Sequence, residues 1–298
     1  RRVWDAVNKL TFNELFNVWV GRFLPPSDRS NLDGPYYLNA WYFPEIVQRY
    51  PAIFAGRNDG LAIWGQIVGG MFKYQVGVFE GTGQDPVITT GEIVLGTTTN
   101  GDTVLSPVFI RTNGPNQEDN PLFAGRLTLN LLDPEPGYYN SSTYYGGKDV
   151  LAIGVAGMYQ EDATGVAGNA GSFTGWNVDL LFEKDLGGAC VATLEGAFYD
   201  YDTEGKATGE GQGFLGLASF LLPKKIGSGA IAGQLQPMVR YQEFENEGLI
   251  AGEHSRTDIG LNHIINGHNA RVSLTYSMDD PATGSDADIV KLGFQFQI

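Results

Sequence analysis

Hydrophobic and polar residues alternate along most of the chain, in successive segments of about ten residues. In the clearest segment, Val290, Leu292 and Phe294 alternate with Lys291 and Gln295. A period of two places neighbouring side chains on opposite faces of a β-strand. The pattern predicts an all-β protein with about 13 visible antiparallel strands, at residues 3–10, 16–24, 57–67, 72–80, 122–132, 148–159, 175–183, 190–201, 214–222, 233–244, 256–265, 270–277 and 288–298.

The connections between these segments alternate between short and long. Residues 69–70, 185–188, 223–229 and 266–268 form short turns. The long connections are acidic and comprise residues 25–56, 81–121, 160–174, 202–213, 245–255 and 278–287. One connection, residues 133–147, is long where a short turn is expected. Short turns at one rim and long loops at the other are typical of a transmembrane antiparallel β-barrel, whose apolar faces contact lipid.

This pattern predicts one barrel domain over residues 1–298. We expect residues 25–56 to fold inward as a constriction loop and residues 81–121 to form a long extracellular loop. If the last strand ends at the short-turn rim, the first visible strand runs inward, and an even-numbered barrel then needs one or three strands upstream. We therefore expect N-terminal strands to be missing from this chain.

Composition and charge exclude several other classes. No stretch approaches the roughly 20 apolar residues that a spanning helix requires, which excludes a helical membrane protein. The chain has 34 acidic and 19 basic residues, a formal net charge of −15, and its bases are scattered, which argues against nucleic acid. The lone Cys190 and three ill-spaced histidines predict neither a disulfide nor a metal centre, and no catalytic motif occurs in a suitable context. We expect no enzyme activity and no cofactor.

Several motifs resemble the phosphate-selective porin O and P family of the Gram-negative outer membrane. They are Val18-Trp19-Val20-Gly21-Arg22-Phe23-Leu24-Pro25-Pro26, Arg57-Asn58-Asp59-Gly60, residues 74–81 and the hairpin at residues 259–271. The resemblance implies a barrel of about 16 strands, a homotrimer and a long loop folded into the channel. Selective members of the family carry a ladder of basic residues in the channel. This chain has few such residues on its inward face, so we expect weak ion selectivity.

The barrel interpretation places a set of polar side chains in the lumen. Fixed charges there would bias ion passage. The predicted pore-lining residues are Lys73, Arg126, Arg240, Arg271, Lys291, Gln75 and Gln236. Alternatively, acids on the same face, such as Asp179, Glu183 and Glu195, neutralise these bases within the wall.

Three arginines lie in or beside the 25–56 connection. If it folds inward, Arg29, Arg49 and Arg57 meet at the constriction. The alternative is that they anchor the loop to Asp28, Asp33 or Glu45.

Aromatic residues cluster near the predicted strand ends. We expect these rings to form girdles at the lipid interfaces, and sugar stacking is the alternative. The residues are Tyr36, Tyr37, Trp41, Tyr42 and Phe43 at the outer rim and Tyr138, Tyr139, Tyr144 and Tyr145 at the inner rim. The acidic loops are candidates for divalent cations that bridge to lipopolysaccharide, or are solvated charge.

Together these features predict an outer-membrane porin for passive diffusion of small hydrophilic solutes or ions. The alternative is a structural or interaction barrel with a plugged lumen, in which the acidic loops bind a surface partner.

Overall fold

The computed structural model describes residues 5–49, 56–83, 87–97 and 103–297. The chain is all-β, with 60% strand and 4% helix, which confirms the predicted class. No helix in these residues is long and apolar enough to cross a membrane. Besides the short helix α1 (Arg29–Asp33) and two 3-10 turns, the elements are β1 (Ala6–Thr11), β2 (Asn17–Phe23), β3 (Asn58–Ile67), β4 (Phe72–Phe79), β5 (Val87–Thr97), β6 (Thr103–Thr112), β7 (Leu122–Asn130), β8 (Val150–Val166), β9 (Asn169–Gly187), β10 (Cys190–Asp202), β11 (Gly211–Leu221), β12 (Lys225–Ile226), β13 (Gly233–Asn246), β14 (Gly252–Asn266), β15 (Ala270–Asp280) and β16 (Ala287–Phe296).

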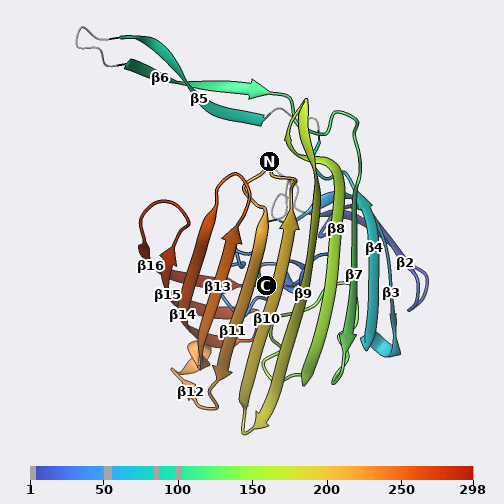
Figure 1. The fold of residues 1–298 in the computed structure, drawn as a ribbon. Helices are drawn as coiled ribbons and strands as arrows, with labels where there is room; N and C mark the ends of the chain where they lie inside the picture. Colours follow the sequence, from blue (N-terminus) through green and yellow to red (C-terminus); the bar gives the residue numbers. More distant parts are fainter. Residues whose placement is uncertain (1–4, 50–55, 84–86, 98–102, 298) are drawn as a thin grey trace.

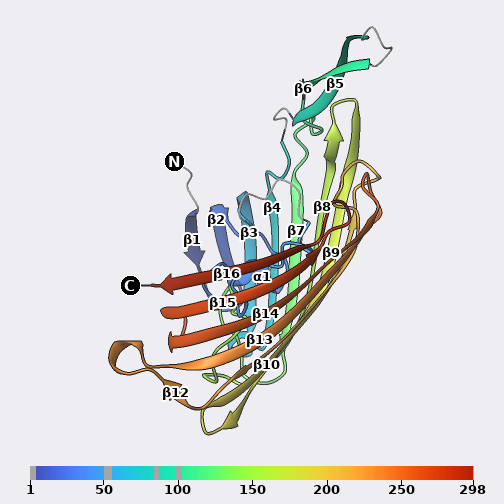
Figure 2. The ribbon, with the colours of Figure 1, turned by 90° about the vertical axis from the view of Figure 1, so that its left-hand side faces the viewer.

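One antiparallel sheet of 14 strands forms the body of the protein. Its order is β1-β2-β3-β4-β7-β8-β9-β10-β11-β13-β14-β15-β16, with the short β12 paired to β13. The sheet curves strongly, so that β1 and β16, at the two ends of this order, lie on the same side of the molecule (Figure 2). Among the described residues, no ladder joins β1 to β16. The 13 strands of the main path correspond one to one with the 13 predicted segments.

The connection at residues 81–121 contains a hairpin that the sequence pattern did not predict. Strands β5 and β6 pair only with each other and project beyond the rim of the main sheet (Figures 1 and 2). Glycines and Pro107 interrupt the alternation in this segment. Proline is tolerated at edge strands, and both strands of a two-stranded ribbon are edges. The long connection predicted for residues 81–121 thus contains two strands that were not among the 13 predicted segments.

The connection at residues 160–174 was also expected to be a loop, and it is mostly strand. The β8–β9 ladder resumes at Thr164↔Gly171 and continues to Val166↔Asn169, beyond an irregularity that begins after Gln160. A bulge shifts the register and breaks the period of two, so polar residues in an extended ladder resembled a loop.

The two faces of the sheet have opposite chemical character. On the convex face, apolar side chains are exposed, for example Leu127 (53%), Ile259 (53%) and Phe294 (60%). On the concave face, charged side chains such as Lys73 and Arg271 are buried. Water-soluble proteins arrange these residue types the other way round.

Two irregular segments lie against the concave face. Residues 24–49, which include α1, form the first, and residues 131–149 form the second; Figure 2 shows α1 inside the curve of the sheet. An apolar cluster joins them to the wall, and within it Trp19 of β2 stacks on Tyr138 at 4.5 Å between ring centroids. Tyr138 is therefore buried inside the curve, where the sequence predicted a position in a girdle at the lipid interface.

Glycine on the wall lets one of these segments pack closely. A Cβ at Gly293 of β16 would lie 2.2 Å from the Trp41 ring, so only glycine leaves room for this contact. Trp41 consequently lies against the inner wall rather than in the outer girdle that the sequence predicted.

Candidate functional site

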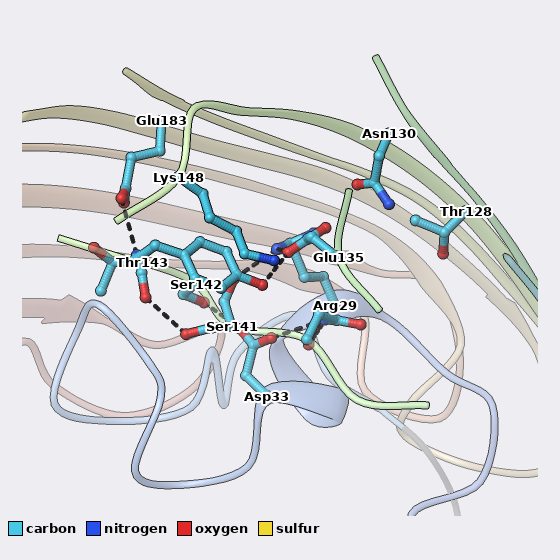
Figure 3. A network of polar contacts seen from close by, with 12 residues as sticks. Arg29, Asp33, Thr128, Asn130, Glu135, Ser141, Ser142, Thr143, Lys148 and Glu183 are labelled. Carbon is cyan, nitrogen blue, oxygen red and sulfur yellow. Dashed lines mark hydrogen bonds and ion pairs between the residues drawn. The ribbon is translucent and has the colours of Figure 1, made fainter. Parts of the chain in front are cut away.

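The two inward segments meet at a buried ion pair. Helix α1 begins at its N-cap Asp28, whose side chain accepts a hydrogen bond from the Asn31 amide. The guanidinium of Arg29 forms a bidentate pair with Glu135, including an Nη1–Oε2 bond of 3.0 Å, and donates to the Ser141 carbonyl at 2.6 Å (Figure 3). The two charged side chains are only 3% and 1% exposed. The Arg29–Glu135 pair thus fastens residues 24–49 to residues 131–149.

The last residue of α1 is held by the same segment. Asp33 accepts a hydrogen bond from Asn140 Nδ2 at 2.8 Å and another from the Ser142 hydroxyl (Figure 3). Gly34 then ends the helix with a φ of 69°, a left-handed conformation that favours glycine. Both termini of this one-turn helix are therefore fixed by residues 131–149. We call Arg29, Asp33, Glu135, Asn140 and Ser142 the interior network.

Strand β9 anchors residues 131–149 to the wall. Glu183 accepts hydrogen bonds from the amides of Tyr144 at 2.9 Å and Gly146 at 3.1 Å, and from Thr193 of β10 at 3.1 Å. Within residues 131–149, Lys148 donates a hydrogen bond to the Pro134 carbonyl at 2.6 Å. Glu183 was expected to neutralise lumenal bases, and its described partners are all uncharged donors.

A second ion pair on the wall supports α1. Arg126 of β7 donates to both oxygens of Asp179 of β9 at 2.5 and 2.7 Å, and to the Ser27 carbonyl at 3.0 Å. Asp179 also accepts from the Arg29 amide at 3.1 Å. Gly154 of the intervening β8 is required here, because a Cβ would lie 2.1 Å from Arg126 Nη2.

Arg271 holds residues 38–41 from the opposite side of the curve. Its Nη1 donates to the carbonyls of Leu38 at 2.6 Å and Asn39 at 3.3 Å, and its Nε donates to Gln295 Oε1 at 3.0 Å. The guanidinium lies 5.4 Å from the centroid of the Trp41 ring.

Arg240 repeats this arrangement two strands away. It pairs with Asp258 of β14, with 2.9 Å between Nε and Oδ2, and donates to the Tyr42 carbonyl at 2.6 Å. Lys291 lies over the Tyr42 ring, 3.9 Å from its centroid. The bases expected to face an open lumen thus bind the inner segment.

The remaining predicted pore-lining residues are also engaged. Lys73 and Gln75 of β4 donate to the carbonyls of Tyr139 at 3.4 Å and Tyr138 at 2.6 Å. Gln236 of β13 donates to Ser219 and accepts from Asn262. All three side chains are buried.

The three arginines proposed for the constriction have separate partners. Arg29 belongs to the interior network, and Arg49 lies over the Phe244 ring at 4.8 Å. Arg57 pairs with Asp5, with 3.1 Å between Nε and Oδ1. The contacts of Arg29 and Arg57 fit the alternative of anchoring, although their acids, Glu135 and Asp5, differ from those expected, and the contact described for Arg49 is with an aromatic ring.

Sequence reasoning missed the residues that Arg29 and Asp33 bind. Glu135, Asn140, Ser141 and Ser142 all lie in the connection whose length broke the rule of alternating turns. That exceptional length was the available signal that the segment folds inward.

The interior network contains two acids that titrate differently. Burial opposes ionisation of Glu135, but the charge and hydrogen bonds of Arg29 outweigh it and hold the pKa of Glu135 below its usual value. Burial raises the pKa of Asp33 to about 7, although Arg29, Ser142 and Asn140 act in the opposite direction. Asp33 also interacts electrostatically with Glu135 and with Glu195 of β10. The net charge of the network therefore changes near neutral pH.

This titration predicts a pH-dependent ion preference if the interior conducts ions. Above about pH 7 Asp33 adds one negative charge, so cation preference should be greater at about pH 8.5 than at about pH 5.5. Reversal potentials in a KCl gradient at both values measure this change. Asp33→Asn should reduce it, with the neighbouring acid Glu195 contributing the remainder, and a pH response of the same size in that variant would refute the assignment.

The same raised pKa affects folding. Because the folded pKa of Asp33 exceeds that of an unfolded aspartate, ionisation of Asp33 opposes folding. Its contribution to stability consequently falls as the pH rises from about 4 to about 7.

Comparison with known proteins gives one relative and no family. No protein-family model matches the chain. A protein from Aquifex aeolicus (strain VF5), described as uncharacterized, is 26% identical over 277 residues, which cover 88% of this chain and 59% of that protein. The chain therefore spans about three-fifths of the length of the relative it matches.

Proposed function

We propose that the chain forms the wall of an outer-membrane porin for passive diffusion of small hydrophilic solutes or ions. The observation that carries this proposal is the inverted distribution of side chains, with apolar residues exposed on the convex face and charged residues buried on the concave face. A β-strand needs about 9–11 residues to cross a bilayer, and β7 to β11 have 9 to 19. If this apolar band faces lipid, exposure of these side chains is favourable, whereas in water it would promote aggregation.

Closure of the curved sheet into a barrel belongs to this proposal. Unpaired strand edges are not tolerated in lipid, so β1 and β16 must each find a partner strand there. Following the family resemblance, the proposal places the barrel in the outer membrane of a Gram-negative bacterium, as a homotrimer in contact with lipopolysaccharide.

The interior contacts support weak ion selectivity. Arg29, Arg126 and Arg240 form ion pairs with acids, and Lys73 and Arg271 donate to backbone carbonyls. In the three ion pairs the carboxylate offsets most of the field that a free base would exert on a passing ion, whereas Lys73 and Arg271 keep their charge. We therefore expect weaker anion selectivity than a ladder of unpaired bases would give.

Single-channel recording tests the proposal. Purified protein inserted into a planar lipid bilayer should give discrete conductance steps, and the reversal potential in a KCl gradient should lie close to zero. A reversal potential near the ideal anion value would contradict the selectivity argument, and failure to conduct at all would contradict the pore.

One observation favours the alternative of a plugged structural barrel. The apolar cluster that includes Trp19, Leu32, Val47 and Tyr138 fills space between the inner segments and the wall. A plug held this way would leave no continuous water path. Planar bilayers would then show no conductance steps, although the protein inserts.

A further inference from the structure

A cavity of about 750 Å³ opens between the two inward segments. Four tyrosines, Tyr36, Tyr37, Tyr139 and Tyr144, contribute to its lining, together with the polar side chains of Asn140 and Ser141. Small-molecule sites usually enclose about 300–1,000 Å³ and combine apolar surface with a few polar groups that orient the ligand. This cavity has that size and composition.

Two of the four tyrosines of the cavity are held by neighbouring side chains, and the other two are exposed. Tyr139 packs against Trp19, with 5.5 Å between ring centroids, and the Tyr144 hydroxyl is bound by Glu135. Tyr36 and Tyr37 are 51% and 41% exposed. Two exposed rings are thus available to a ligand beside two rings that neighbouring side chains hold.

The charges around the cavity are already satisfied. Arg57 is paired with Asp5, and Asp33 accepts two hydrogen bonds from its own network. Burial lowers the pKa of His268, so this side chain is neutral at neutral pH. An anion would therefore find no unpaired base in the described lining, and a neutral ligand avoids the larger desolvation cost of a charged one.

We propose that this cavity binds a neutral mono- or disaccharide. The inference rests on the proposed function and names the solute class that the interior would accept. The apolar face of a pyranose ring suits a tyrosine ring, and its hydroxyls suit amide and hydroxyl partners. Asn140 and Ser141 line the cavity, and the Asn140 Oδ1 atom, which is buried, has no hydrogen-bond partner among the described residues, so a small rotation of this amide would offer it to a sugar hydroxyl.

Calorimetric titration in detergent micelles tests the site, with maltose as the saccharide and inorganic phosphate and choline as charged probes. Maltose should bind, and phosphate and choline should not. Tyr37→Leu should weaken maltose binding about tenfold, which corresponds to about 1.4 kcal/mol. Tyr37→Phe, which keeps the ring, should retain most of the affinity.

Tyr276→Leu is the matched control, because Tyr276 is 38% exposed on the convex face of β15 and lies outside the cavity. Its maltose affinity should equal that of the unsubstituted protein. Equal loss in both leucine variants would overturn the site, as would binding of phosphate or choline without maltose.

Bilayer recording separates failure of this site from failure of the pore. Maltose should reduce the conductance of the unsubstituted channel and leave that of Tyr37→Leu nearly unchanged. If the protein forms channels but does not bind maltose, and maltose does not change the conductance, the saccharide site is refuted and the pore is not. Maltose binding by a protein that forms no channels supports the site and overturns the pore.

Discussion

Replacing Leu127 by arginine is expected to lower the free energy of unfolding in a lipid bilayer by about 2–4 kcal/mol. Leu127 lies near the middle of β7 with its side chain 53% exposed on the convex face. If that face contacts hydrocarbon, the new charge must be buried in lipid or carry water with it. Urea unfolding of protein folded into phospholipid vesicles, followed by tryptophan fluorescence, measures the loss.

Leu249→Arg is the matched control for this experiment. Leu249 is also an exposed leucine, but it lies in the connection between β13 and β14, outside the strands. Surface substitutions away from packed or lipid-facing positions usually change stability by no more than about 0.5 kcal/mol. Equal, small effects of both substitutions would mean that the convex face contacts water, and the porin proposal would fail.

Glu135→Ala is expected to destabilise the protein by about 3–5 kcal/mol. The substitution leaves the Arg29 guanidinium buried without its carboxylate partner and also removes the acceptor of the Tyr144 hydroxyl. A buried charge without a partner is among the largest losses of folding free energy that a single substitution can cause. Urea unfolding in micelles, followed by tryptophan fluorescence, measures the change, and Trp19 contributes to this signal because its ring stacks on Tyr138.

Two variants make this prediction specific to the buried pair. Arg29→Met combined with Glu135→Leu removes both charges and should recover much of the loss. Glu45→Ala breaks an exposed pair with Arg256, in which Glu45 is 58% exposed, and should cost no more than about 1 kcal/mol. A Glu135→Ala cost as small as that of Glu45→Ala would show that Arg29 and Glu135 do not hold the two segments together.

The strands of the main sheet could be predicted from sequence because their signal is local. In β16, the face of each residue follows from its neighbours alone, and Leu292 and Phe294 are exposed while Gln295 is buried. The same reasoning placed Lys73, Arg126 and Arg271 on the inner face. The prediction missed β5 and β6, where Pro107 interrupts the period, and the part of β8 that follows the bulge after Gln160.

The partners of the inward residues could not be predicted. Arg29 and Glu135 are 106 positions apart, Arg126 and Asp179 are 53 apart, and Arg271 contacts a carbonyl 233 positions away. No local pattern encodes such contacts. They depend on which strands become neighbours and on the path of two irregular segments, each stabilised by many weak contacts at once.

The amino-acid sequence by itself determined the class of structure and the opposite chemistry of the two sheet faces, because a period of two is a property of adjacent residues. Only the tertiary structure decided what the inner face does. The curvature of the sheet brought residues 24–49 and 131–149 into contact. The bases predicted to line the lumen therefore donate hydrogen bonds to buried backbone carbonyls of the inner segment. Buried carbonyls and carboxylates require partners, and the nearest donors on the wall were these arginines.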